Sequence, residues 1–279
     1  MTLQLVKTVK DLRASVAPWR GQGLKIGLVP TMGALHAGHL SLVTQMRAAS
    51  DRVVVSIFVN PTQFGPAEDF ESYPREPQKD LEKLAAVDLV YMPTVSEMYP
   101  EGNVTLAANP GLSDVLCGKF RPGHFDGVAT IVSKLFLQVQ PDAAIFGEKD
   151  FQQLLVIRRM TADLALPVKV LSAPTVREAD GLALSSRNAY LNKNERKIAA
   201  ILPATLTRLI EKARAGKDLR DLEKDGEVAL VQGGFNRVDY IEFREDDTLS
   251  LSPEAGPKTR LFGAAHIGTT RLIDNMPLS

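Results

Sequence analysis

The sequence has 279 residues, 44% hydrophobic and 24% charged, which is typical of a globular chain and excludes disordered and low-complexity proteins. Its 33 Lys and Arg residues balance 33 Asp and Glu residues, so no net positive charge attracts nucleic acid or anionic lipid. The single cysteine, Cys117, excludes an intrachain disulfide and fits a reducing compartment. We expect neither a signal peptide nor a membrane span, and interpret the protein as cytoplasmic.

Short β-branched segments alternate with helical patterns over roughly the first two-thirds of the chain. The expected strands are 25–29, 52–59, 88–92, 143–146 and 168–171, and the expected helices are 39–49, 78–86, 127–140 and 152–164. The helix at 127–140 has the clearest pattern, because its apolar residues recur at intervals of three and four. This alternation predicts an α/β fold, a Rossmann-like doubly wound parallel sheet covered by helices.

The character of the sequence changes near Val176, which predicts a first domain of residues 1–176 and a smaller α+β domain of residues 177–279. A polar segment precedes two helical patterns, at 195–215 and 219–232, and we expect Pro203 to kink or divide the first of them. Three strand-like segments follow, at 238–244, 260–266 and 269–273, with Ile267 and Gly268 forming a tight turn before the last. We interpret this second domain as a lid.

The most informative segment joins the first expected strand to the first expected helix and reads PTMGALHAGH. In an open parallel sheet, the loop after a strand is where ligands bind. Gly33 and Gly38 permit a close backbone approach, and the N-terminus of the following helix favours anions. His36 and His39, three residues apart, can both donate to phosphate oxygens. Since the chain contains neither a Walker A sequence nor G-x-G-x-x-G after a strand, we expect a polyphosphate site of another kind.

Two further segments carry side chains suited to a triphosphate. Residues 184–188 read LSSRN and offer two hydroxyls and a guanidinium, which can form two parallel hydrogen bonds to phosphate. After the expected strand at 143–146, Lys149 could neutralise phosphate charge and Asp150 could hold ribose or a metal. Each segment alone is also compatible with a polar hinge or a surface turn.

Taken together, these motifs resemble a known family. H-x-G-H at 36–39 resembles the HIGH signature of the nucleotidylyltransferase superfamily, and LSSRN resembles the mobile KMSKS-type loop of the same enzymes. With SIFVNPTQFGPAEDFESYPR, RPGHF, FGEKDFQQL, READGLALSSRN and GTTRLIDN, the sequence resembles the pantoate–β-alanine ligase (pantothenate synthetase) family from about Val29 to Asn275.

The resemblance implies an ATP-dependent ligase of pantothenate and coenzyme A biosynthesis. Such an enzyme condenses (R)-pantoate with β-alanine through a pantoyl-adenylate and releases diphosphate and AMP. The resemblance also implies Mg2+ and a homodimer formed through the first domain. The expected partners are small-molecule substrates, with no nucleic acid and no membrane. The alternative that stays open is a nucleotidyltransferase of the same superfamily that retains the nucleotide on its product.

The resemblance also assigns roles to residues. His39 would be the proton donor, with His36 and Lys149 holding phosphate, while Gln63 and Gln153 would bind pantoate. The ATP-binding residues implied are Met32, Gly33, Ala34, Leu35, His36, Ala37, Gly38, His39, Gly147, Glu148, Lys149, Asp150, Val176, Leu184, Ser185, Ser186 and Arg187. Asp80 and Asp150 are candidates for the Mg2+ carboxylate, and the sequence does not choose between them. Arg121 and His124 are expected to support the site without taking part in the chemistry.

Overall fold

The computed structural model describes residues 3–66, 68–102 and 104–279, and its contacts divide the chain into two compact units. Unit 1 comprises Met1–Asn109, Arg121–Glu148 and Gln153–Pro174, and unit 2 comprises Pro110–Phe120, Lys149–Gln152 and Thr175–Ser279. Two short segments that precede residue 176 therefore pack with the C-terminal part of the chain. Local sequence patterns do not reveal such packing, because it depends on residues far away in the chain.

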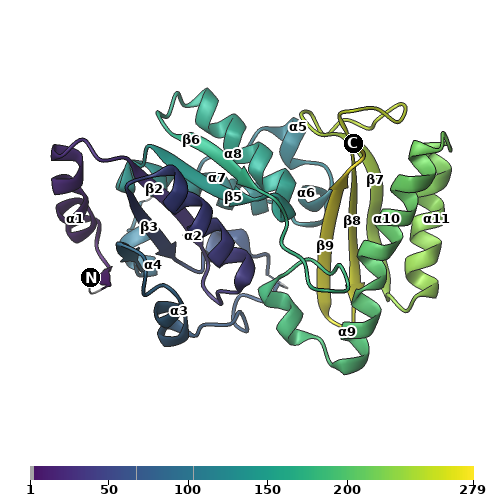
Figure 1. Cartoon of the computed structure of the whole chain (residues 1–279), viewed down its shortest axis with the longest axis horizontal. Helices are drawn as coiled ribbons and strands as arrows, with labels where there is room; N and C mark the ends of the chain where they lie inside the picture. The colour runs from purple at the N-terminus through teal and green to yellow at the C-terminus, as the bar shows by residue number, and fades with distance from the viewer. Residues whose placement is uncertain (1–2, 67, 103) are drawn as a thin grey trace. The chain divides into compact units, whose positions relative to one another are not determined.

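Unit 1 is built on a six-stranded parallel sheet with the strand order β1-β4-β3-β2-β5-β6, of which β2, β3, β5 and β6 are labelled in Figure 1. The strands are β1 (Gln4–Val6), β2 (Ile26–Thr31), β3 (Arg52–Ile57), β4 (Leu89–Tyr91), β5 (Ala143–Gly147) and β6 (Lys169–Ala173). The chain runs from β2 through β3 to β4, and then continues on the other side of β2 with β5 and β6. The direction of winding therefore switches between β2 and β5, and the predicted doubly wound parallel sheet is confirmed.

Helices cover this sheet. They are α1 (Val9–Gly21), α2 (Ala37–Ala49), α3 (Pro77–Lys83), α4 (Val95–Met98), α7 (His124–Val139) and α8 (Phe151–Asp163), and a 3-10 turn, η1 (Pro61–Gln63), follows β3. Met46 of α2 is buried in one cluster with Val53 and Val55 of β3. Helix α7 packs with α1 and β2 and is buried along most of its length, as its apolar spacing predicts. Strand β1 and helix α1 were not predicted, because charged and polar residues obscure their short apolar patterns.

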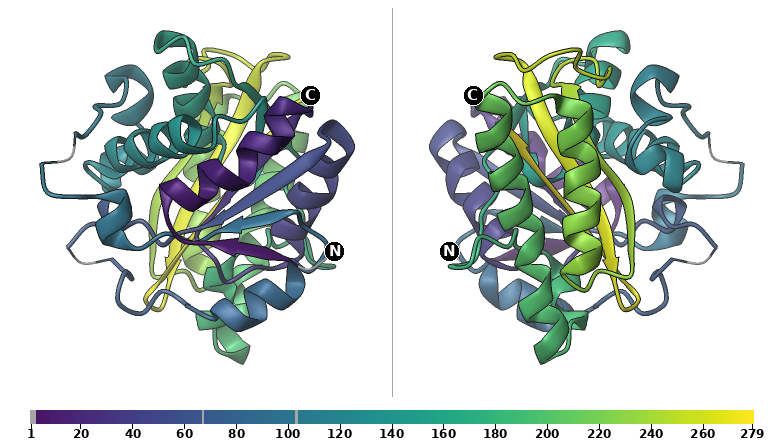
Figure 2. Two further views of the ribbon diagram at one scale, coloured as in Figure 1. Left: turned by 90° about the vertical axis from the view of Figure 1, so that its left-hand side faces the viewer. Right: turned by 90° about the vertical axis from the view of Figure 1, so that its right-hand side faces the viewer.

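Unit 2 contains a three-stranded antiparallel sheet, β7 (Arg237–Glu245), β8 (Thr259–Ile267) and β9 (Thr270–Pro277). Helices α10 (Ile201–Arg214) and α11 (Leu219–Gln232) lie along this sheet (Figure 2, right). Short helices α5 (Pro110–Ser113), α6 (Cys117–Phe120) and α9 (Lys193–Ala199) complete the unit. The predicted division of the first helical region is confirmed. However, it falls at Ala200, and Pro203 lies in the first turn of α10, where its missing N–H costs no hydrogen bond.

No helix in the described part of the chain is both long enough and apolar enough to cross a membrane.

Candidate active site

Three of the segments singled out from the sequence follow three neighbouring strands of unit 1. The loop that leads to His36 and His39 follows β2, the turn that carries Gln63 follows β3, and Gly147 ends β5. Because β3, β2 and β5 are adjacent and parallel, these segments share one edge of the sheet. This edge includes the switch point between β2 and β5, which is where doubly wound sheets bind their ligands.

His36 and His39 lie at the N-terminus of α2, with their ring centroids 4.1 Å apart. The backbone N–H of Gly38 donates to Nδ1 of His36 at 3.2 Å, and the backbone N–H of His36 donates to Nδ1 of His39 at 3.4 Å. A ring nitrogen that accepts from an N–H carries no proton, so the proton of each neutral ring is on Nε2. In the neutral form of each ring, Nε2–H is therefore the side-chain donor, which is the kind of group that binds a phosphate oxygen or transfers a proton.

Helix α3 holds the loop in front of these histidines. Asp80 accepts from the backbone N–H groups of Ala34 at 2.9 Å and Leu35 at 2.8 Å, and Lys83 Nζ donates to the Leu35 carbonyl at 2.6 Å. Gly33 and Ala34 have φ values of 83° and 49°, and the left-handed conformation of Ala34 is strained. A side chain at position 33 would also approach Asp80 Oδ2, at 3.0 Å from an added Cβ. The sequence did not predict this function of Asp80.

The two carboxylates considered for Mg2+ therefore differ. Asp80 is only 2% exposed and both of its oxygens accept hydrogen bonds from the loop, so the geometry disfavours it as a metal ligand. The side chain of Asp150 is 47% exposed and lies 3.7 Å from Lys149 Nζ. No group of three or more His, Cys, Asp or Glu residues in the described ranges could hold a metal. Asp150 alone is an exposed carboxylate of the two. A single carboxylate would fit a magnesium ion that takes most of its ligands from substrate phosphate and water, because such an ion needs few protein ligands.

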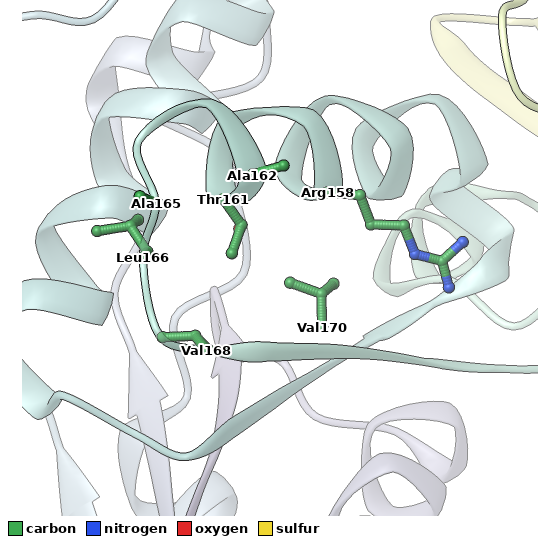
Figure 3. A pocket seen from close by; sticks show the side chains of 7 residues that line it. All are labelled: Arg158, Thr161, Ala162, Ala165, Leu166, Val168 and Val170. Carbon is green, nitrogen blue, oxygen red and sulfur yellow. The ribbon is translucent and has the colours of Figure 1, made fainter.

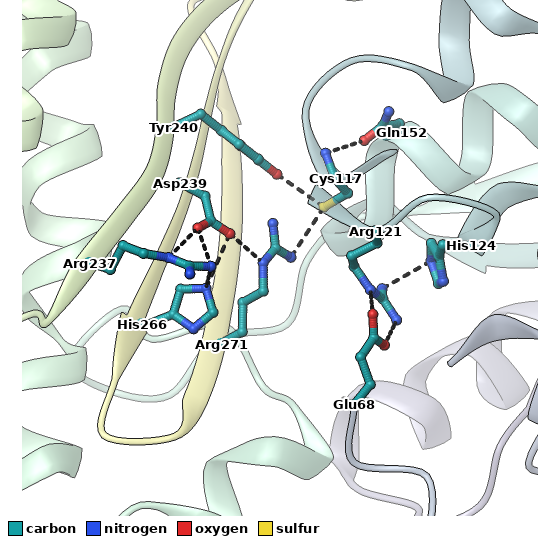
Figure 4. Close-up of polar contacts among 10 residues, drawn as sticks. All are labelled: Glu68, Cys117, Arg121, His124, Gln152, Arg237, Asp239, Tyr240, His266 and Arg271. Atoms are coloured by element: carbon teal, nitrogen blue, oxygen red, sulfur yellow. Dashed lines mark hydrogen bonds and ion pairs between the residues drawn. The ribbon is translucent and has the colours of Figure 1, made fainter. Parts of the chain in front are cut away.

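Gln63 is 8% exposed and is held through both its main chain and its side chain. Asn60 Nδ2 donates to Gln63 Oε1 at 2.9 Å. The Gln63 carbonyl accepts from Arg121 Nη2 at 3.1 Å and from His124 Nδ1 at 2.8 Å, and Arg121 also pairs with Glu68 (Figure 4). Arg121 and His124 thus hold the main chain of Gln63, a residue that is predicted to bind the substrate.

Two adjacent glutamines at the start of α8 have different environments. Gln152 is buried; its Nε2 donates to the carbonyls of Leu112 and Val115, and its Oε1 accepts from the N–H of Cys117. Gln153 is half-buried, and its role in binding pantoate stays a prediction. Gln152 is therefore a structural residue of unit 2, and the prediction of pantoate binding concerns Gln153 alone.

In unit 2, three of the segments that carry the family resemblance lie side by side. Arg177 donates to both carboxylate oxygens of Asp274, at 2.6 and 2.9 Å. The next residue of β9, Asn275, donates from Nδ2 to the carbonyl of Lys149 at 2.9 Å. Strand β9 therefore connects the Lys149 segment to READGLALSSRN.

The predicted ATP residues of this second segment are also neighbours. The N–H of Leu184 donates to the carbonyl of Val176 at 3.0 Å, so the chain between them forms a closed loop. Ser185 then caps the 3-10 helix η3 (Ser186–Tyr190), its Oγ accepting from the N–H of Arg187 at 3.3 Å. The serine pair and Arg187 are therefore presented from one short turn.

A buried polar cluster in unit 2 was not predicted (Figure 4). Cys117 Sγ lies 3.1 Å from the hydroxyl of Tyr240 and 3.4 Å from Arg271 Nη1, and Arg271 Nε donates to Asp239 at 2.8 Å. His266 Nε2 lies 3.2 Å from the same carboxylate. Burial opposes ionisation of Asp239, but the hydrogen bonds and charges of Arg271 and His266 outweigh it and lower the pKa of Asp239. Cys117 thus contacts polar groups in addition to filling space.

A surface hollow of about 500 Å³ lies between α8 and β6 in unit 1 (Figure 3). Its lining residues are Arg158, Thr161, Ala162, Ala165, Leu166, Val168 and Val170. None of them was predicted to bind a substrate, and a mostly apolar lining with one guanidinium does not suit a triphosphate.

The doubly wound sheet, with two histidines beside its switch point, defines an α/β protein that carries an H-x-G-H motif at its ligand-binding edge. The family model of pantoate-beta-alanine ligase matches residues 4–277. A curated pantothenate synthetase from Paramagnetospirillum magneticum is 51% identical over 276 residues, covering 98% of this chain and 97% of the relative. The crystal structure of pantothenate synthetase from Thermus thermophilus has a TM-score of 0.91 and 46% identity, covering 99% of both chains.

A third relative was solved with small molecules bound. It is the pantoate-beta-alanine ligase from Francisella tularensis, complexed with "Beta-gamma ATP and Beta-alanine", with a TM-score of 0.85, 33% identity and coverage of 99% of this chain and 98% of that chain. The chain belongs to the pantoate-beta-alanine ligase family. The resemblance inferred from the sequence motifs is confirmed.

Proposed function

We propose that this protein joins (R)-pantoate to β-alanine in an ATP-dependent reaction that gives pantothenate, AMP and diphosphate. The observation that carries the proposal is the pair of Nε2–H donors beside the β2/β5 switch point in a chain of this ligase family. The Francisella relative, with an ATP compound and β-alanine bound, supports these two molecules as substrates.

The reaction has two balanced steps. First, a pantoate carboxylate oxygen attacks the α-phosphorus of ATP, and the bond from that phosphorus to diphosphate breaks to give pantoyl-adenylate. Second, the neutral β-alanine amine attacks the acyl carbon, the bond to AMP breaks with its electron pair going to AMP, and the nitrogen releases one proton to solvent. The first step requires alignment and positive charge more than a covalent protein nucleophile.

The roles of individual residues are part of this proposal. His39 donates a proton or hydrogen bond to the departing diphosphate, His36 and Lys149 hold phosphate, and Gln63 and Gln153 bind pantoate. ATP contacts come from residues 32–39, 147–150, 176 and 184–187. A bound Mg2+, for which Asp150 is the exposed candidate carboxylate, would lower the negative charge of the phosphates. The assignment of residues 177–279 as a lid stays a prediction, as does a cytoplasmic location, where Cys117 would remain reduced.

The first test is pantoate-dependent exchange of labelled diphosphate into ATP, with magnesium and without any amine. Reversible formation of pantoyl-adenylate predicts exchange, and subsequent addition of β-alanine should produce AMP in equal amount to pantothenate. Chelation of magnesium should abolish both signals. Folded protein that binds ATP but gives neither exchange nor AMP would contradict the proposal, and a product that keeps the nucleotide would favour the alternative nucleotidyltransferase.

We further propose a homodimer formed through residues 1–176. The proposal rests on the family resemblance and on the frequency of symmetric dimers among soluble proteins. Light scattering after size exclusion should give about twice the mass of the 30.4 kDa chain. A monomer mass that does not change with protein concentration would contradict it.

A further inference from the structure

The side chain of Gln63 is hydrogen-bonded to Asn60, and the backbone carbonyl of Gly127 determines which way the Asn60 amide points. Asn60 is 1% exposed, and its Nδ2 donates to the carbonyl of Gly127 at 3.2 Å. A backbone carbonyl only accepts, so the Asn60 atom that faces it must be the amide nitrogen. The same Nδ2 donates to Gln63 Oε1, which turns the oxygen of the Gln63 amide toward Asn60 and leaves Nε2 on its other side.

Two hydroxyls support this orientation from the other end of Asn60. Tyr99 donates to Asn60 Oδ1 at 2.6 Å, and Thr62 Oγ1 donates to the same oxygen at 3.0 Å. Burial raises the pKa of the Tyr99 hydroxyl, so it remains a protonated donor at neutral pH. Rotation of the Asn60 amide would break the bonds to the Gly127 carbonyl and to Gln63 Oε1, because an amide oxygen cannot donate to either.

Close packing of α7 against η1 makes the hydrogen bond between Asn60 and the Gly127 carbonyl possible. A Cβ at Gly127 would lie 2.3 Å from the carbonyl oxygen of Thr62, so only glycine allows the helix to approach this closely. The main chain of Gln63 is held independently by Arg121 and His124. The Gln63 side chain is therefore fixed both in position and in the direction of its amide.

We propose that Tyr99 and Asn60 are positioning residues that make Gln63 a hydrogen-bond donor to an oxygen of the hydroxy-acid substrate. Gln63 Nε2 is the atom that meets the substrate, and it selects a carboxylate oxygen, because a reversed amide would place an acceptor against an oxygen that only accepts. This inference rests on the proposed function, since it uses Gln63 as a pantoate residue. The new element is that Gly127, Asn60 and Tyr99 determine which atom of the Gln63 amide faces the substrate.

The main test replaces Tyr99 with phenylalanine, which removes only the hydroxyl. We expect Tyr99→Phe to raise the KM for pantoate in the exchange assay about 3- to 10-fold, the size of one lost hydrogen bond. The KM for ATP should stay within about twofold of wild type. Tyr91→Phe is the matched control, because Tyr91 is a buried tyrosine of the same unit whose hydroxyl donates to Gln138 at 3.0 Å and not to the Gln63 chain.

A second variant and a double-mutant cycle sharpen the test. Asn60→Asp has nearly the same shape but cannot donate to Gln63 Oε1, so Gln63 should rotate and the KM for pantoate should rise by more than about tenfold. Because Tyr99 acts through Gln63, Tyr99→Phe should change the KM for pantoate less than about twofold when Gln63 is already alanine.

The outcomes are distinct. An unchanged pantoate KM in folded Tyr99→Phe overturns the positioning role, as does an equal rise in Tyr91→Phe or an undiminished effect of Tyr99→Phe in the Gln63→Ala background. Wild-type protein that neither catalyses exchange nor binds pantoate in calorimetry would overturn the proposed function itself, and the positioning proposal with it. Normal wild-type exchange with an unaffected Tyr99→Phe variant would overturn the positioning proposal alone.

Discussion

His39→Ala is expected to reduce the turnover of diphosphate exchange on the order of 10²- to 10⁴-fold, the usual range for loss of a general acid. The substitution removes an Nε2–H donor from the N-terminus of α2, where it would face the charge that develops on the departing diphosphate. His39 is only half-buried, so the core should remain intact. Loss of the bond from the N–H of His36 should cost about 1 kcal/mol of stability, as for other helix caps.

Thr44→Ala is the control for this variant, because Thr44 is an exposed residue of the same helix. It should retain the turnover and melting temperature of the wild type. Near-normal turnover in a folded His39→Ala protein would remove His39 from the mechanism.

Asp80→Ala is expected to weaken ATP binding and to destabilise the protein. It leaves the N–H groups of Ala34 and Leu35 without their acceptor, and each buried unpaired group costs about 1–3 kcal/mol. The left-handed conformation of Ala34 also loses its support, so the loop should leave the geometry that places both histidines. We expect the KM for ATP to rise on the order of tenfold or more, with a clear drop in melting temperature.

The conservative variant Asp80→Asn should give a smaller effect, because an amide oxygen can still accept one of the two bonds. Glu82→Gln is the matched control, since Glu82 is an exposed carboxylate on the same helix. If Asp80→Ala lowers the melting temperature but leaves the KM for ATP unchanged, Asp80 stabilises the fold without positioning the ATP loop.

The features that the sequence alone determined are those with a local pattern. Apolar residues at intervals of three and four predicted a helix at 127–140, and the structure has α7 at His124–Val139. Alternating strands and helices predicted the parallel sheet. The motif PTMGALHAGH marked the loop after β2 as a candidate phosphate-binding loop, because its glycines and histidines all lie within ten consecutive residues. The order of the family segments was sufficient to identify the family that the comparisons confirm.

Only the tertiary structure showed what holds those residues in place. Asp80 reaches Ala34 across 46 positions, and Tyr99 reaches Asn60 across 39, so neither pair produces a spacing signal in the sequence. The segment that carries Cys117 belongs to unit 2 for the same reason, since its contacts with Tyr240 and Arg271 join residues more than a hundred positions apart. A hydrogen bond depends on distance and direction in space, whereas periodicity reports only the neighbours along one helix or strand. Candidate substrate-binding groups could therefore be proposed from the chain, but the groups that hold them in place appear only once it has folded.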